Sequence, residues 1–320
     1  RVDEGERLGA APRANSGRGV SYWQDDSGNG RIIVVTPGYQ MVALDPHSGQ
    51  QIEGFGEGGV VDLMGQHRSR DGIDMVGSVG ASSPATVAGD VLVVGSAHHI
   101  GMRPPSKTNT PGDIRGYDAQ SGELLWTFKT IPEPGEFGVD TWENESWSYT
   151  GNAAAWAPIA YDPESGFVYV PTEAATGDYY GGHRHGNNLF STSLVALDSR
   201  TGERVWHFQT IHHDIWDWDN PTSPILADLT IDGAPRKIVA QITKQGFVFV
   251  FDRLTGDPIW PIEERAVPQT DIPGEWTSPT QPIPTKPLPF EPQGFSEDDL
   301  IDFTPEIKAR AAEIASAYRM

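Results

Sequence analysis

The sequence contains no cysteine. This excludes disulfide bonds, thiolate metal sites and cysteine nucleophiles, and it leaves the cellular compartment open. Long hydrophobic runs are absent as well, since no apolar stretch approaches the roughly 18 residues that would cross a bilayer. The chain starts Arg-Val-Asp-Glu, without an initiator methionine or a hydrophobic signal stretch, so we expect a mature or trimmed chain.

Positive charge is scarce. The 320 residues include 23 Lys and Arg against 44 Asp and Glu, which gives a net charge of −21. A nucleic-acid-binding protein would need a basic face for phosphate, so the charge argues against this class. An anionic membrane surface is an equally poor partner. The 36 glycines, 26 prolines and 10 tryptophans predict instead a turn-rich globular protein with a sizeable core.

A short motif recurs along the chain. It consists of Asp, two variable residues, Ser or Thr, and Gly, and in all copies but the first a Trp follows the Gly at a fixed spacing. In a tight hairpin the Asp can accept backbone N–H bonds and the Gly can supply a positive φ. The Trp then offers a large flat anchor for the neighbouring unit. The copies begin at Asp45, Asp118, Asp198 and Asp252.

Each copy follows further apolar strands, which gives about four units of roughly four strands. This pattern predicts an all-β fold: a β-propeller of four-stranded antiparallel blades in a single domain over residues 1–320. The alternative is a β-sandwich with coincidental turns. The expected blade-like units cover residues 20–56, 81–130, 154–209 and 222–262.

The C-terminal segment, residues 263–320, has a different pattern. Its first part, up to residue 296, is rich in proline and poor in strand pattern. Thr304 then has the features of an N-cap, with Pro305 at the first helical position. Apolar residues follow at helical spacing, which predicts a short amphipathic C-terminal helix over residues 305–319, packed on the side of the propeller.

The recurring motif is similar to the tryptophan-docking motif of quinoprotein dehydrogenases that use pyrroloquinoline quinone (PQQ). Non-catalytic propellers share that motif, so a second segment is more specific. Residues 211–219, IHHDIWDWD, resemble the His-His-Asp-x-Trp-Asp segment of the membrane glucose dehydrogenase branch. Residues 18–23 and 242–253 are similar to the same branch, and the resemblance covers nearly the whole chain.

The resemblance implies an eight-bladed propeller of which these residues form the N-terminal half. A second chain, or a missing C-terminal half, would complete it. We therefore expect the blades to form a semicircle with Trp156, Asp217 and Lys244 on its concave inner edge. A closed four-bladed ring is the competing arrangement.

The resemblance also implies roles for particular residues. Asp217 would accept the proton of the substrate hydroxyl while hydride passes to the quinone. Trp156 would stack under the quinone ring, and Lys244 and Arg18 would supply positive charge to its oxygens and carboxylates. The structural alternatives are a turn-capping Asp, a core Trp and a Lys that reaches solvent.

A metal ion, Ca²⁺ or Mg²⁺, is implied beside the quinone. Thr176 aligns with one ligand position, and Glu173 is an alternative oxygen donor. The carboxylate expected as the first ligand is missing, because Ala97-His98-His99 stands there and hard cations prefer oxygen. The sequence His183-Arg184-His185 indicates either a transition-metal site or a flexible glycine-rich loop. For His212-His213 we expect orienting or structural roles.

The function implied is a PQQ-dependent dehydrogenase that oxidises an alcohol or sugar hydroxyl. Its electron acceptor would be cytochrome c or a membrane quinone, and its place the bacterial periplasm, soluble or peripherally attached. Two alternatives remain: a non-catalytic scaffold propeller of the outer-membrane assembly type, and a degenerate quinoprotein without cofactor.

Overall fold

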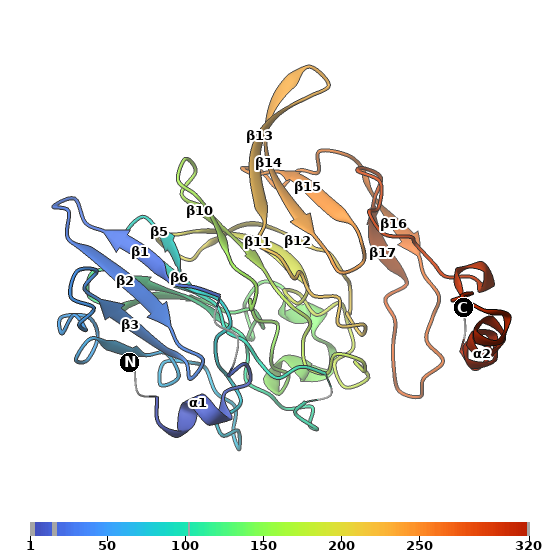
Figure 1. Ribbon diagram of the computed structural model, residues 1–320, viewed down its shortest axis with the longest axis horizontal. Coiled ribbons are helices and arrows are strands. Elements are labelled where there is room, and N and C mark those ends of the chain that lie inside the picture. The colour runs from blue at the N-terminus through green and yellow to red at the C-terminus, as the bar shows by residue number, and fades with distance from the viewer. Residues whose placement is uncertain (1–3, 15–17, 102, 319–320) are drawn as a thin grey trace.

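The computed structural model describes residues 4–14, 18–101 and 103–318, and it is built almost entirely from antiparallel sheets (Figure 1). The first sheet contains β1 (Ser21–Gln24), β2 (Gly30–Val35), β3 (Gln40–Leu44) and β4 (Val60–Asp62). The second contains β5 (Thr86–Ala88), β6 (Val91–Val94), β7 (Ile114–Asp118) and β8 (Leu124–Phe128). The third contains β9 (Ala160–Asp162), β10 (Phe167–Pro171), β11 (Ser193–Asp198) and β12 (Arg204–Gln209).

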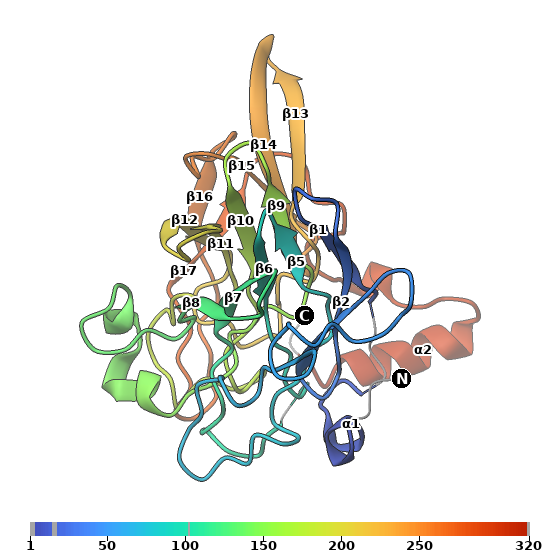
Figure 2. The same cartoon turned by 90° about the vertical axis from the view of Figure 1, so that its left-hand side faces the viewer.

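Two smaller sheets and a few short helices complete the described chain. The fourth sheet contains β13 (Ile225–Ile231), β14 (Ala234–Ile242) and β15 (Val248–Asp252), and the β13–β14 hairpin projects beyond the other sheets (Figure 2). A strand pair, β16 (Ile262–Ala266) and β17 (Thr280–Pro284), follows. The helices are α1 (Glu6–Ala10), η1 (Val139–Thr141), η2 (Glu143–Ser148), η3 (Glu297–Asp299) and α2 (Pro305–Ala315).

The hydrophobic cores lie between successive sheets. Side chains alternate between the two faces of a strand, and in β6 this alternation serves two cores: Leu92 packs with the first sheet, and Val93 with the third. In β10 Val168 faces the second sheet while Tyr169 faces the fourth. Each inner sheet is therefore covered on both faces, as expected for stacked propeller blades.

The recurring motif forms the predicted turn. Asp118 accepts the backbone N–H groups of Gln120 and Ser121, and the motif glycines have φ between 69° and 77°. The indole N–H of Trp126 donates to the Ser199 carbonyl in the turn of the next sheet, at 3.0 Å. Trp206 donates in the same way to the Arg253 carbonyl, at 3.1 Å. Trp126 and Trp206 therefore anchor their sheets to the following ones, as predicted, whereas Trp260 packs with its own sheet.

The first strands of the first four sheets form the inner edge of the fold. β1 contacts β5, β5 contacts β9, and β9 contacts β13. The first sheet and the β16–β17 pair lie toward opposite sides of the molecule, with α2 beyond the pair (Figure 1), and no strand pairing among the described residues joins them. The all-β propeller architecture is confirmed, as an open series of blades.

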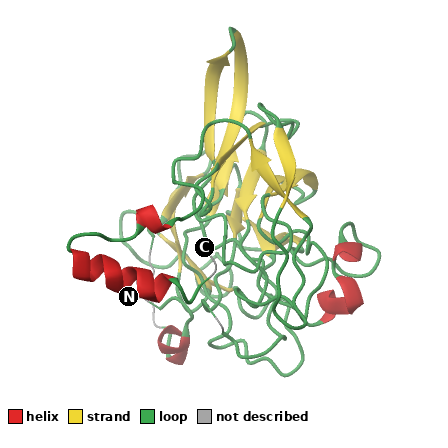
Figure 3. Ribbon diagram, turned by 90° about the vertical axis from the view of Figure 1, so that its right-hand side faces the viewer, coloured by secondary structure: helices red, strands yellow, loops and turns green. Residues whose placement is uncertain are grey.

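Two expectations for the C-terminal segment are wrong. The proline-rich stretch contains the paired strands β16 and β17. Prolines are tolerated in this sheet because it has only two strands, so no further strand needs a backbone N–H from the proline positions. Helix α2 does not pack on the sheets: none of its residues is buried, and it stands apart from them (Figures 2 and 3). Its apolar positions, Ile307 and Ile314, find no covering surface in the described chain.

None of the helices that the structure describes is both long and apolar enough to span a membrane.

Candidate active site

The residues predicted for the site all lie in segments that precede the first strand of a sheet or follow its second strand. Because neighbouring strands are antiparallel, these segments emerge at the same end of each sheet. Segments before first strands carry Arg18, Trp156 and Asp217, and segments after second strands carry Glu173, Thr176 and Lys244.

The carboxylate of Asp219 connects several of these segments. Its Oδ2 atom accepts hydrogen bonds from the Trp156 indole N–H, at 3.1 Å, and from the Lys244 ammonium, at 2.9 Å. Its Oδ1 atom accepts the backbone N–H of Ala174, at 2.9 Å. Asp219 is buried, so this charge is balanced by its partners rather than by solvent. The sequence motifs assigned no role to Asp219, so this role was missed.

Lys244 also binds Asp217. Its ammonium lies 3.3 Å from Asp217 Oδ2 and donates to the Asp217 carbonyl at 2.7 Å. The Lys244 side chain is only 30% exposed, so the alternative of a lysine that simply reaches solvent does not describe it. Burial alone would lower the pKa of Lys244, but the carboxylates of Asp219 and Asp217 outweigh burial and raise it.

The segment that carries Asp217 is a turn, and Asp217 and Asp219 reach the same ammonium. Asp214 accepts the backbone N–H groups of Trp216 and Trp218, at 2.9 and 3.1 Å, and so holds a local turn. Asp217 itself has a φ of 58°, which turns its side chain toward Lys244. The residue that caps a turn in this segment is therefore Asp214, whereas capping was the structural alternative considered for Asp217.

Burial and repulsion between carboxylates shape the electrostatics. Burial, and then Asp219, raise the pKa of Asp217, while Lys244 works against this. Burial and the carboxylates of Asp217 and Asp219 raise the pKa of Asp178 to about 7. A cluster of acids with raised pKa values in one part of a protein is typical of functional sites.

Trp156 stands at the meeting point of three cations. The Arg18 guanidinium lies 4.8 Å from the indole centroid and donates to the Trp156 carbonyl at 3.0 Å. The Arg13 guanidinium lies 5.7 Å from the centroid of the same ring. Lys244 does not need to touch the indole, because both donate to the same oxygen of Asp219. Trp156 is only partly buried and belongs to none of the hydrophobic cores that the described residues form. The alternative that Trp156 is a structural core residue therefore does not describe it.

The two residues predicted to bind a metal, Glu173 and Thr176, have different surroundings. Glu173 is buried and its Oε1 atom has no hydrogen-bond partner among the described residues, while burial and then Asp219 raise its pKa well above the usual range. Thr176 Oγ1 accepts a hydrogen bond from Asn109 at 3.0 Å. The described part of the chain holds no group of three His, Cys, Asp or Glu side chains that could bind a metal ion.

The histidines singled out by sequence have other partners. His183 and His185 lie within hydrogen-bond distance of the backbone carbonyls of Thr176 and Gly274, at 2.9 Å each. Arg184, between them, is fully buried. His98 is also buried, and burial lowers its pKa to about 3, so its ring is neutral at physiological pH.

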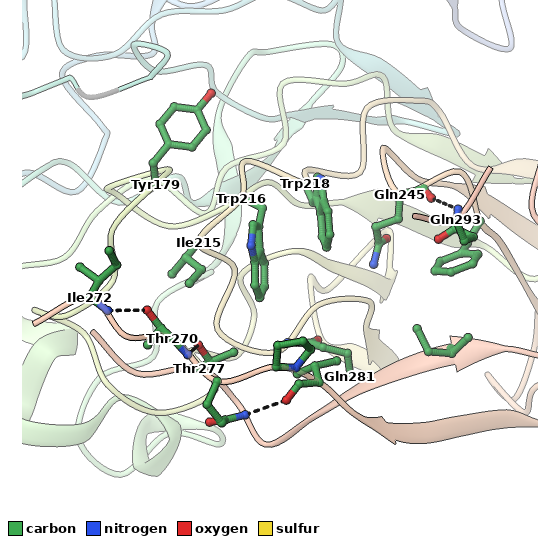
Figure 4. A pocket seen from close by; sticks show the side chains of 15 residues that line it. Tyr179, Ile215, Trp216, Trp218, Gln245, Thr270, Ile272, Thr277, Gln281 and Gln293 are labelled. Carbon is green, nitrogen blue, oxygen red and sulfur yellow. Dashed lines mark hydrogen bonds between the residues drawn. The ribbon is translucent and has the colours of Figure 1, made fainter. Parts of the chain in front are cut away.

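A cavity of about 600 Å³ adjoins the Asp217 segment (Figure 4). The rings of Trp216 and Trp218 stack there, with centroids 5.0 Å apart and planes 24° from parallel. No residue that lines this cavity carries a formal charge; the wall includes Ile215, Trp216, Trp218, Gln245, Phe247 and Ile272. Sequence reasoning missed this cavity, because Phe247 and Ile272 reach it from distant parts of the chain.

The whole chain, residues 1–320, matches the family model described as the β-propeller domain of PQQ glucose, ethanol and alcohol dehydrogenases. The chain belongs to this family of PQQ-dependent dehydrogenases. The recognition made from the docking motif and the His-His-Asp-x-Trp-Asp segment is thereby confirmed.

Relatives of this quinoprotein chain include two curated dehydrogenases. The glycerol dehydrogenase large subunit of Gluconobacter oxydans is 35% identical over 309 residues, which are 94% of this chain and 40% of the relative. The quinoprotein glucose dehydrogenase of Escherichia coli is 33% identical over 255 residues, which are 79% of this chain and 31% of the relative. The chain thus spans well under half the length of these proteins.

Solved dehydrogenase structures share the fold. The quinohemoprotein alcohol dehydrogenase ADHIIG of Pseudomonas putida superposes with a TM-score of 0.64 at 28% identity, covering 82% of this chain and 37% of that one. A europium-containing methanol dehydrogenase gives a TM-score of 0.66 at 22% identity, covering 89% of this chain and 47% of that one, and shows likeness of fold alone.

Proposed function

We propose that this chain forms the N-terminal half of the catalytic propeller of a dehydrogenase that oxidises an alcohol or sugar hydroxyl with PQQ. The observation that carries the proposal is that four separate segments meet. Trp156 and Lys244 both bind the Asp219 carboxylate, Arg18 lies against Trp156, and Asp217 binds Lys244. A scaffold propeller gives no reason for that convergence.

The surroundings of Trp156 fit the cofactor. PQQ is planar and carries three carboxylates, so its site needs an aromatic surface and several cations. Arg13, Arg18 and Lys244 gather around one indole in a chain with a net charge of −21. When bound, PQQ supplies the quinone that accepts hydride from the substrate carbon.

The side chains of this chain then act as follows. Trp156 supports the ring, and Arg18 and Lys244 balance its negative charge. Asp217 accepts the hydroxyl proton, and its raised pKa makes it a stronger base than an exposed Asp. Lys244 keeps Asp217 ionised before the reaction, and Asp219 keeps Lys244 and Trp156 in fixed positions. We assign no step to a metal; Glu173 and Thr176 remain the residues proposed to hold one.

The partners and location follow from the same proposal. A second chain or a further segment completes the ring of blades, and a cytochrome c or a membrane quinone takes up the electrons. The bacterial periplasm is the proposed compartment.

The test is a titration of the full-length gene product with PQQ, followed by absorbance and by quenching of Trp fluorescence. A dye-linked assay over a panel of neutral alcohols and sugars follows. We expect saturable binding and turnover of at least one hydroxyl compound. Absence of PQQ binding, with and without added Ca²⁺ or Mg²⁺, would leave the degenerate quinoprotein as the correct interpretation.

A further inference from the structure

The loop between β16 and β17, residues 267–279, folds back onto the segment that carries the candidate base. Its Glu275 side chain is 2% exposed, and its Oε1 atom lies 3.1 Å from Nε2 of His213, whose side chain is fully buried. The other oxygen, Oε2, accepts the backbone N–H of Gly181 at 2.5 Å. One carboxylate thus joins the β16–β17 loop, the 211–219 segment and the 177–186 loop.

His213 is fixed on both sides of its ring. Its Nδ1 atom lies 3.0 Å from the Gly186 carbonyl, so Nδ1 carries a proton and donates it. The opposite nitrogen, Nε2, faces Oε1 of Glu275. One proton shared by these two atoms makes a hydrogen bond, whether it resides on Nε2 or on Oε1. Burial lowers the pKa of His213, and the bond to Glu275 counteracts part of this effect. The Trp276 ring packs edge-on against the imidazole, with centroids 5.0 Å apart.

Arg184 extends the network to the loop that holds Thr176. Its buried guanidinium donates to the Thr176 carbonyl at 3.0 Å and to the Asp214 carbonyl at 2.5 Å. A buried guanidinium requires nearby negative charge, and the carboxylates of Asp214 and Glu275 supply it. The backbone N–H of Asp217 also donates to the Asp178 carbonyl, at 3.2 Å. Together these bonds fix the spacing between the Thr176–Asp178 loop and the segment that carries Asp217 and Asp219.

The adjacent histidine offers a natural comparison. His212 Nε2 lies 3.1 Å from Glu264 Oε1 on the same strand pair, but the Glu264 side chain is 51% exposed. An exposed ion pair contributes little, whereas removing one partner of a buried one leaves an unpaired polar group. The two His–Glu pairs have the same chemistry and nearly the same distance, and they differ in burial and in the segments that they join.

We propose that Glu275 is a positioning residue: through His213 and Gly181 it holds the two segments that carry Thr176, Asp217 and Asp219 at the spacing that the PQQ site requires. This inference rests on the proposed function. It predicts that a residue in a loop outside the four larger sheets controls cofactor affinity without contacting the cofactor.

The experiment compares Glu275→Ala with Glu264→Ala in the full-length protein. We expect Glu275→Ala to raise the Kd for PQQ about tenfold or more, which is the usual scale for losing a partner that orients a binding group. Backbone hydrogen exchange should accelerate in residues 176–181 and 211–219. Glu264→Ala should leave both quantities at the wild-type value. Glu275→Gln keeps an acceptor for Gly181 and a donor for His213, so it should recover most of the affinity.

Each outcome decides the inference. Unchanged PQQ affinity and exchange in folded Glu275→Ala would overturn it, as would an equal effect of Glu264→Ala. A lower Tm with no local acceleration of exchange would reduce Glu275 to a purely structural role. Should Glu275→Ala fail to fold, Glu275→Asp replaces it, because the shorter carboxylate cannot reach both partners; wild-type exchange there would also overturn the inference. If the wild-type protein binds no PQQ, the proposed function fails first, and the exchange data still show whether Glu275 fixes the spacing.

Discussion

At the scale of single residues, the two neighbouring carboxylates Asp217 and Asp219 have different surroundings. Asp219 is buried, and both of its carboxylate oxygens are engaged in accepting three hydrogen bonds. Asp217 is less buried, and its Oδ2 atom lies 3.3 Å from the Lys244 ammonium. The geometry therefore favours Asp217 as the base and Asp219 as the residue that orders the site.

Replacing Asp217 by Asn tests this division. Asn keeps the size of the side chain but cannot accept a substrate proton, so turnover should fall by about 10²-fold or more. PQQ affinity should change little, because Lys244 stays bound to Asp219. Steady-state kcat and a PQQ titration measure the two quantities. Turnover near the wild-type value in the Asn variant would refute the assignment of the base.

Trp156 can be tested by two substitutions that separate its ring from its indole N–H. Trp156→Ala removes the stacking surface, which should weaken PQQ binding by about 1–3 kcal/mol, the scale of aromatic stacking on flat ligands. Trp156→Phe keeps a ring but loses the bond to Asp219, so its loss should be smaller. PQQ titrations of the three proteins provide the comparison. Equal affinities in all of them would show that the cofactor does not rest on this side chain.

The motif residues of the site could be predicted from sequence because each belongs to a short segment with a recognisable pattern. Asp219 and Arg13 could not be assigned, since their contacts join segments that are far apart in the chain. The Asp219 contact with Trp156 spans 63 positions, and the Glu275 contact with His213 spans 62. Only the stacking of the sheets brings such pairs together.

At the scale of the elements, the repeated turn explains how one blade fixes the next. The Asp and Gly of the motif form the same turn in each copy, which is why the blades could be predicted from the sequence. What the pattern could not show is the β16–β17 pair, because prolines conceal a strand whose hydrogen bonds are made on one side only.

The contribution of Trp docking can be measured with matched glycine variants. Gly49 and Gly202 occupy the same place in the motif with φ of 69° and 72°, so an Ala costs about 1–2 kcal/mol of backbone strain at either position. A Cβ at Gly202 would also lie 2.5 Å from the Trp126 ring, whereas at Gly49 it would meet nothing within 4 Å. Gly202→Ala should therefore lower the free energy of unfolding by about 1–3 kcal/mol more than Gly49→Ala. Urea denaturation of both variants measures the difference. Equal losses of unfolding free energy would mean that the Trp126 ring can move aside at no cost.

At the scale of the whole molecule, the series of blades is open and its C-terminal part is unusually apolar on the outside. Leu288 and Phe303 are each 82% exposed, and α2 buries none of its residues. Large apolar side chains exposed together are typical of an interface. The relatives at 35% and 33% identity are more than twice as long as the matched region.

We expect the segment from residue 286 to 315 to be covered in the protein as it occurs in the cell, by the further blades or the second chain proposed above. Burial of large apolar side chains from water stabilises such an interface by about 25 cal/mol per Å², so these residues should be protected there and reactive in residues 1–320 alone. Covalent footprinting of Leu288 and Phe303 in both forms measures the protection. The tip of the β13–β14 hairpin, around Gly233, projects away from the other sheets and serves as the internal control, with equal labelling in both forms (Figure 3). Equal labelling of Leu288 and Phe303 as well would show that this surface stays open, and the completing blades would then have to be sought elsewhere on the molecule.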